Sequence, residues 1–114
     1  MHPMSRIAFL AGVLLCGCAE SLPEHIDLQP AAAQVDFATE PPSPNGYKLV
    51  GQVEGVSAAS DLDVAQQAAH NDLRNKAAAL GASLVTIDQD LAEPLPLTYK
   101  MKVRLVGRAY QALE

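Results

Sequence analysis

One long amphipathic helix is the feature that most restricts what this chain can fold into. Between residues 61 and 80, apolar side chains recur at intervals of three and four, which places them in one stripe roughly 120° wide on a helical wheel. Ser60 or Asp61 can cap the start of this helix, and Gly81 suits the position after its end. Because half of the stripe is alanine, the helix can lie close to a sheet. The stripe consists of Leu62, Ala65, Ala69, Leu73, Ala77 and Leu80.

Segments with β-strand patterns lie on both sides of this helix. The last of them alternates apolar with mostly basic residues, which is typical of a strand with one buried and one solvent-exposed face. In an earlier segment, Gly51 and Gly55 mark either a bulge or a close approach of two backbones. Prolines and an Asn-Gly pair indicate the loops. The predicted strands are residues 34–39, 47–56, 83–88 and 99–110, with loops at 40–46 and 90–98.

Together these elements predict an α+β fold. We expect a small antiparallel or mixed sheet of three to four strands, with the one long helix packed on one face. The chain has 114 residues, which is enough for one modest domain and not for two.

The first 17 residues have the features of a lipoprotein signal peptide. A positive start with Arg6 precedes an apolar run at residues 7–15 that is too short to span a bilayer as a helix. The sequence LCGC at residues 15–18 then resembles a lipobox, in which a leucine and a small residue precede the cysteine to be modified. An ordinary signal peptide that happens to contain cysteines is the alternative.

Lipidation of Cys18 would set both the location and the organisation of the protein. The resemblance to lipoprotein precursors implies three acyl chains on Cys18, and each buried methylene adds about 0.8 kcal/mol of membrane affinity. Ala19 is not the aspartate that resembles an inner-membrane retention signal, so we expect an outer-membrane lipoprotein that faces the periplasm. The predicted parts are a signal peptide at residues 1–17, a flexible tether at 18–33 that starts from lipidated Cys18, and a single α+β domain at 34–114.

Composition argues against several classes of partner. The formal net charge is −5 and becomes −6 when Arg6 leaves with the signal peptide, so nucleic acid is not an expected partner. The absence of tryptophan, with only three tyrosines and two phenylalanines, argues against an aromatic-lined carbohydrate or base-stacking platform. No disulfide is expected, because Cys16 lies in the removed segment and Cys18 would be acylated.

The segment from Tyr47 to Tyr110 resembles a known family. Its glycine-punctuated strand GYKLVGQVEG is followed by AHNDLRNKAAALGASLVTID, in which the block from Asn71 to Ala78 is the most distinctive part. With the lipobox, these motifs are similar to a family of small bacterial lipoproteins described as domain of unknown function 4156. They are more distantly similar to the RcsF-like stress-sensing outer-membrane lipoproteins, although the mature domain lacks the cysteines that RcsF ties into disulfides. The resemblance implies a fold and an envelope location, and it assigns no chemistry.

Neither a catalytic centre nor a metal site stands out in the sequence. His70, Asp72 and Arg74 lie close together on the helix, but no cysteine and no nucleophile-elbow serine accompanies them. Acidic residues after the third strand lack the spacing of a calcium loop. We therefore expect no enzyme activity, no bound metal and no cofactor. The acidic residues are Asp88, Asp90 and Glu93.

Two surfaces are candidates for binding a partner. One is a helix surface formed by Asn71, Arg74 and Asn75, with Arg74 as the strongest candidate because bidentate donors recur at interfaces. Next to it, Lys76 is expected to pair locally or to reach past the sheet edge. The other is the basic face of the last strand, which would attract anionic lipid, polysaccharide phosphates or an acidic protein, unless it only protects an edge strand. Its residues are Lys100, Lys102, Arg104 and Arg108.

The expected function is that of a non-enzymatic, lipid-anchored domain of the cell envelope. It would bind another envelope protein or an anionic lipid or polysaccharide. A metal-dependent or hydrolytic envelope enzyme and a purely structural lipoprotein are the alternatives.

Overall fold

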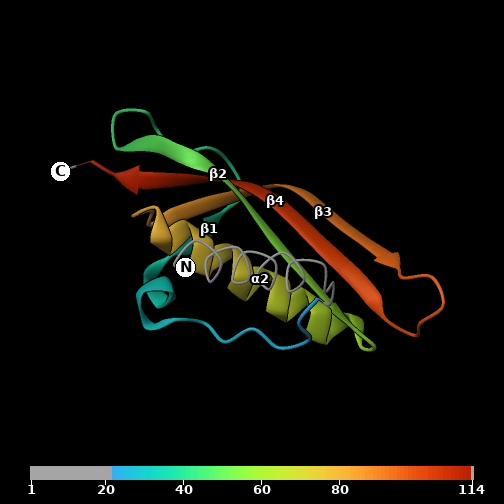
Figure 1. Cartoon of the computed structure of the whole chain (residues 1–114). Helices are drawn as coiled ribbons and strands as arrows, with labels where there is room; N and C mark the ends of the chain where they lie inside the picture. The colour runs from blue at the N-terminus through green and yellow to red at the C-terminus, as the bar shows by residue number, and fades with distance from the viewer. Residues whose placement is uncertain (1–21, 114) are drawn as a thin grey trace, which may run out of the picture.

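The computed structural model describes residues 22–113, which form a four-stranded mixed sheet with one long helix on one face (Figure 1). The elements in chain order are the 3₁₀ helix η1 (Pro30–Gln34), strands β1 (Asp36–Ala38) and β2 (Tyr47–Ala59), helix α2 (Leu62–Ala79), and strands β3 (Leu84–Pro94) and β4 (Met101–Ala112). The strand order is β1-β3-β4-β2, with β1 parallel to β3 and the other pairs antiparallel. The predicted α+β fold is confirmed.

Helix α2 begins and ends where its sequence predicts. The side chain of Asp61 accepts a hydrogen bond of 2.9 Å from the backbone N–H of Asp63, which caps the first turn. At the other end Gly81 adopts a positive φ of 80°. This conformation lets the N–H of Ala82 donate to the carbonyl of Ala77 at 3.0 Å, as in a Schellman motif.

The inner face of α2 packs mainly against β2 and β4. Its buried residues are small apart from Leu73, so the helix lies close to the sheet. At Gly55 the approach is so close that a Cβ atom would overlap the carbonyl oxygen of Ala69 on the helix, which confirms the predicted close approach. Leu62 and Leu80, which were expected in the stripe, lie at the helix ends and are 41% and 45% exposed.

Strand β3 is longer than its sequence predicts. The predicted loop at residues 90–98 is wrong over its first half, because Asp90 to Pro94 pair with Leu105 to Met101 of β4. Two physical reasons explain the difference. All residues from Asp88 to Pro94 are exposed, so no buried face marks this part as a strand, and an irregularity between Ile87 and Gln89 interrupts the alternation.

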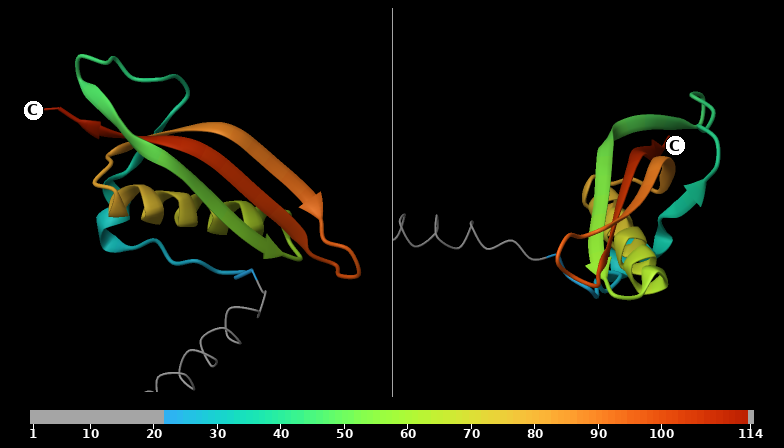
Figure 2. Two further views of the ribbon diagram at one scale, coloured as in Figure 1. Left: turned by 45° about the horizontal axis from the view of Figure 1, so that its top comes forward. Right: turned by 90° about the vertical axis from the view of Figure 1, so that its right-hand side faces the viewer.

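The segment before β1 lies along α2. Residues 22–33 were predicted as part of a flexible tether, but their backbone follows the helix in Figure 2 and is held there by side chains of α2. This segment therefore packs with the domain, which begins before residue 34. The signal peptide, Cys18 and the rest of the predicted tether lie outside the described residues. Among residues 22–113, no helix is long and apolar enough to cross a membrane.

Candidate functional site

Six consecutive residues of α2, from Asn71 to Lys76, connect the helix to three different parts of the molecule. We call them the 71–76 block. Leu73 is fully buried in the core. Since each residue turns by 100° around the helix, its neighbours project to different sides: one set toward the N-terminal segment, and another toward the edge of β2.

Two asparagines of the block hold the N-terminal segment. The side-chain amide of Asn71 donates to the carbonyl oxygen of Ile26 at 2.8 Å. The amide of Asn75, one turn later, donates to the carbonyl of Asp27 at 2.9 Å and accepts from the N–H of Gln29 at 2.8 Å. Side-chain amides thus satisfy backbone groups of an extended segment that has no strand partner.

Arg74 holds the next part of the same segment. Its Nε donates to the carbonyl of Val35 at 3.0 Å, and its Nη2 donates to that of Ala33 at 3.1 Å. The guanidinium also lies 5.8 Å from the ring centre of Phe37, within the range of a cation–π contact. The three residues predicted as a helix interaction surface are therefore brought together by the structure, and all three bind the protein's own backbone.

Asp72 and Lys76 cover the open edge of β2. The carboxylate of Asp72 accepts from the N–H of Val56 at 3.0 Å, and the ammonium of Lys76 donates to the carbonyl of Glu54 at 2.9 Å. The two side chains also form an ion pair with a nitrogen–oxygen distance of 3.1 Å. They bond the polar groups that an edge strand otherwise offers to another chain. The expected local pairing of Lys76 and its reach to the sheet edge are both confirmed.

The basic residues of the last strand do not protect an edge, because β4 lies between β3 and β2. Edge protection was therefore the wrong explanation for their charge. Arg104 pairs with Glu54 across to β2. Arg108 forms two hydrogen bonds of 3.0 Å to the carboxylate of Asp88 on β3. The hydrogen bond and the charge of Asp88 raise the pKa of Arg108 above its ordinary value.

The other two basic residues also lie beside acidic ones. Lys100 pairs with Glu24 of the N-terminal segment at 3.8 Å. Lys102 lies opposite Glu93 in the register of β3 and β4. The four residues predicted as a basic stripe thus share their surface with carboxylates, which lowers the positive potential that an anionic polymer would meet.

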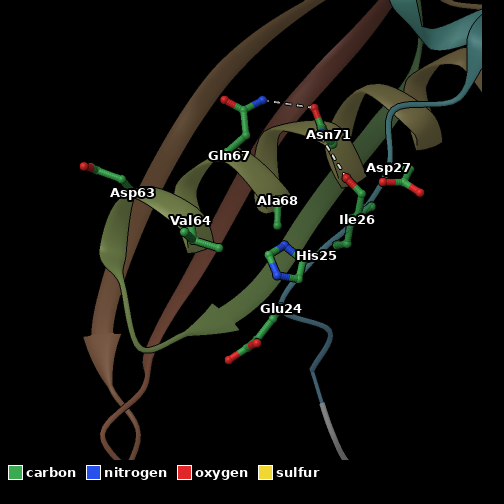
Figure 3. Close-up of a pocket in the computed structure, with 9 residues that line it drawn as sticks. All are labelled: Glu24, His25, Ile26, Asp27, Asp63, Val64, Gln67, Ala68 and Asn71. Atoms are coloured by element: carbon green, nitrogen blue, oxygen red, sulfur yellow. Dashed lines mark hydrogen bonds between the residues drawn. The ribbon is translucent and has the colours of Figure 1, made fainter.

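Two shallow depressions flank the outer side of α2 near its N-terminal end. Asp63 and Gln67 line both of them. The first, with a volume of ≈ 370 Å³, lies between α2 and residues 24–27, and Figure 3 shows Gln67, Asn71 and Ile26 linked across it by hydrogen bonds. The second, of ≈ 440 Å³, is lined by Phe37, His70 and Arg74 besides the shared residues. We call this whole area the outer surface of α2.

The second depression contains the histidine of the predicted cluster. The Nδ1 atom of His70 lies 2.8 Å from the carbonyl oxygen of Gln66, which accepts a hydrogen bond in the tautomer that carries its proton on Nδ1. The ring packs edge-on against Phe37 with a centre distance of 5.3 Å. Within residues 22–113, no three His, Cys, Asp or Glu residues are placed to hold a metal ion. The arrangement offers hydrogen bonds and aromatic contact to a ligand.

The sequence did not indicate that residues 24–27 line a depression. This stretch has no periodic pattern, and the asparagines that hold it were interpreted as partner-binding residues. The only signal is the spacing of Asn71 and Asn75, which places two amides on one side of a helix.

Comparison of the chain with curated proteins gives no matching relative. The family model described as "Domain of unknown function (DUF4156)" matches residues 26–112, which is 87 of the 114 residues. The match includes the docked residues Ile26 to Gln29, the 71–76 block and all four strands. Because it covers most of the sequence, the chain belongs to the DUF4156 family.

Proposed function

We propose that this protein is a lipid-anchored component of the cell envelope, acylated at Cys18, that works as a non-enzymatic binding module. Its expected place is the outer membrane, facing the periplasm. Its expected partner is another envelope protein, bound at the outer surface of α2.

The observation that carries the anchor is the LCGC sequence at residues 15–18, which follows a positive start and an apolar run. The docked N-terminal segment adds a geometric consequence. The described chain begins at Leu22, and the carbonyl of the next residue, Pro23, accepts a hydrogen bond of 2.5 Å from the hydroxyl of Ser57 on β2. Only three residues therefore separate the folded domain from Cys18. A chain of that length spans at most about 14 Å between the Cα atoms of Cys18 and Leu22. The domain would then lie next to the headgroups.

The outer surface of α2 supports the choice of a protein partner. Its two depressions are open and shallow, which fits a protein surface better than a small substrate that must be enclosed. Asp63, Glu24 and Asp27 lie at this surface, so an anionic polymer would meet like charge here. The basic residues of β4, whose charges are mostly paired, give less support to an anionic partner.

Metabolic labelling with a fatty acid tests the anchor. The wild-type protein is expected to carry the label, and Cys18→Ala is expected to accumulate as an unlabelled precursor. Cys16→Ala is the matched control, because it removes the other cysteine and should leave labelling intact. Normal maturation of Cys18→Ala, or equal loss of label in both variants, would contradict the anchor at Cys18.

Photo-crosslinking in living cells tests the binding surface. A photoreactive residue at Gln67, which is exposed on the outer surface of α2, is expected to give a discrete protein adduct. The matched control is Gln52, which is exposed on β2 and lines the depression beside Arg104 on the sheet. Adducts from Gln52 alone, or none from either site, would contradict a protein partner at α2.

A further inference from the structure

The turn between β3 and β4 exposes apolar side chains to an unusual degree. We call residues 95–100 the hairpin tip. Leu97 and Tyr99 are 105% and 97% exposed, the highest values of any large hydrophobic residue in the described chain, and Leu91 on the adjoining part of β3 is 50% exposed. An aliphatic and an aromatic side chain, both free of the core, form an apolar tip that water solvates poorly.

The hairpin tip is nevertheless an ordered structure. The hydroxyl of Thr98 donates to the carbonyl of Leu95 at 3.0 Å and accepts from the N–H of Lys100 at 3.1 Å. The N–H of Leu95 donates to the carbonyl of Lys100 at 3.0 Å. Pro94 and Pro96 have no N–H to satisfy. Few backbone donors of the tip therefore need water, which lowers the penalty for entering an apolar environment.

The backbone conformation at Leu97 is strained. Its φ of 63° is the only positive value of a non-glycine residue between positions 22 and 113. Asparagine or glycine adopts this left-handed conformation more readily than leucine. Strain of this kind persists where the surroundings impose it and is concentrated at functional positions. A leucine at this position fits a site that needs an apolar side chain at its apex.

The hairpin tip lies at the end of the molecule from which the chain leads back to Cys18. Lys100 forms its 3.8 Å ion pair with Glu24, which is two residues after the start of the described chain. In Figure 2 the blue start of that chain lies toward the end that carries the tip, and Tyr47 and Ala112 pair at the other end of the sheet. A lipid anchor at Cys18 would hold this end against the membrane.

We propose that the hairpin tip inserts Leu97 and Tyr99 into the headgroup region of the phospholipid bilayer, as a second contact beside the anchor. This inference rests on the proposed lipidation of Cys18. Tyrosine suits this depth because its ring is apolar and its hydroxyl is polar. Lys100, the last residue of the hairpin tip, pairs with Glu24, so the proposed insertion depends on the two exposed apolar side chains and not on a basic patch. Two side chains bind weakly alone, but the anchor keeps the tip at a high effective concentration near the lipid.

The absence of tryptophan from the chain allows a direct test. Tyr99→Trp introduces a single fluorophore at the hairpin tip, and Tyr47→Trp introduces one at the opposite end of the sheet. Each protein is purified in its mature form from cells and reconstituted into phosphatidylcholine vesicles with or without brominated acyl chains. We expect a blue-shifted emission from the Tyr99→Trp variant, with several-fold stronger quenching by brominated lipid than in the Tyr47→Trp variant.

A second substitution tests the role of Leu97. Leu97→Asn suits the left-handed backbone, so the fold should be kept, and it removes the apolar apex. In the Tyr99→Trp background it is expected to reduce the quenching while the thermal midpoint is unchanged or higher. Equal quenching with and without Leu97→Asn would overturn the insertion of this side chain.

Flotation of the same vesicles separates this inference from the anchor. Protein that floats, but shows equal and weak quenching in the Tyr99→Trp and Tyr47→Trp variants, overturns the hairpin contact and leaves the anchor standing. Protein that fails to float overturns the anchor, and the hairpin contact with it. Protein that floats and is quenched at the tip supports both.

Discussion

Removal of the Asn75 side chain tests whether the N-terminal segment is docked on α2 as described. The amide of Asn75 makes two hydrogen bonds to backbone groups of that segment, to the carbonyl of Asp27 and from the N–H of Gln29. Asn75→Ala removes both bonds. A neutral hydrogen bond contributes about 0.5–1.5 kcal/mol net, and both of these are exposed, so we expect a total loss of about 1–2 kcal/mol.

That loss should appear first in the local equilibrium between docked and undocked segment. A change of about 1–2 kcal/mol corresponds to roughly 5- to 30-fold in an equilibrium constant. The assay is amide hydrogen exchange followed by NMR. The N–H of Gln29 is expected to be protected in the wild-type protein and to exchange roughly 5- to 30-fold faster in Asn75→Ala. The core amides of α2 should change much less.

Two further variants make the result specific. Asn75→Asp keeps an oxygen that can accept from the N–H of Gln29, but it replaces the donor to Asp27 by a negatively charged oxygen beside that carbonyl, so exchange at Gln29 should still be clearly faster than in the wild-type protein. Asn45→Ala makes the same chemical change in the loop before β2, and it should leave exchange at Gln29 unchanged. A Gln29 amide that already exchanges at the rate of an unstructured peptide in the wild-type protein would refute the docked arrangement.

Three other substitutions test the packing of α2. Gly55→Ala forces a methyl group onto the helix backbone at Ala69, and we expect a loss of about 3 kcal/mol in urea denaturation; an unchanged midpoint would mean that the helix lies farther away. Leu73→Asp places an unpaired charge in the core and should unfold the domain, which circular dichroism would detect as a loss of helix signal. A variant with normal thermal stability would contradict the burial of Leu73. Asp72→Ala removes the acceptor for the N–H of Val56 and should lower stability by about 1.5–3 kcal/mol. Asp72→Asn, which keeps an acceptor, should lower it less, and an equal loss in both variants would contradict the role of this bond.

The helix could be predicted in detail because its signals are local. Asp61 and Gly81 mark its ends through hydrogen bonds within a few residues, and the buried face follows from the spacing of apolar residues. The close approach at Gly55 was also predictable, since a glycine in a strand marks such sites. These features depend on short-range chemistry that a single sequence displays.

The distal half of β3 and the docked segment could not be predicted in the same way. Asp88 to Pro94 are exposed on both faces, so their strand conformation depends on pairing with β4 and leaves no hydrophobic pattern. Residues 26–29 are held by side chains more than forty positions away in the chain. Long-range contacts of this kind have no local signature.

The 71–76 block shows the difference between finding residues and assigning their role. Asn71, Arg74 and Asn75 were predicted from the sequence as an interaction surface, and the structure brings the three together on α2. Their partners, however, are carbonyl and N–H groups of the same chain. A polar side chain that faces away from the core can bind its own backbone or a partner, and the sequence alone does not distinguish the two.

The most direct test of the central proposal, the lipid anchor at Cys18, is mass spectrometry of the mature protein extracted from membranes. We expect the first residue to be Cys18, with a mass increase that corresponds to acyl chains on its N-terminal peptide. A mature protein that begins elsewhere, or a Cys18 peptide of unmodified mass, would contradict the anchor and the membrane-adjacent position that follows from it.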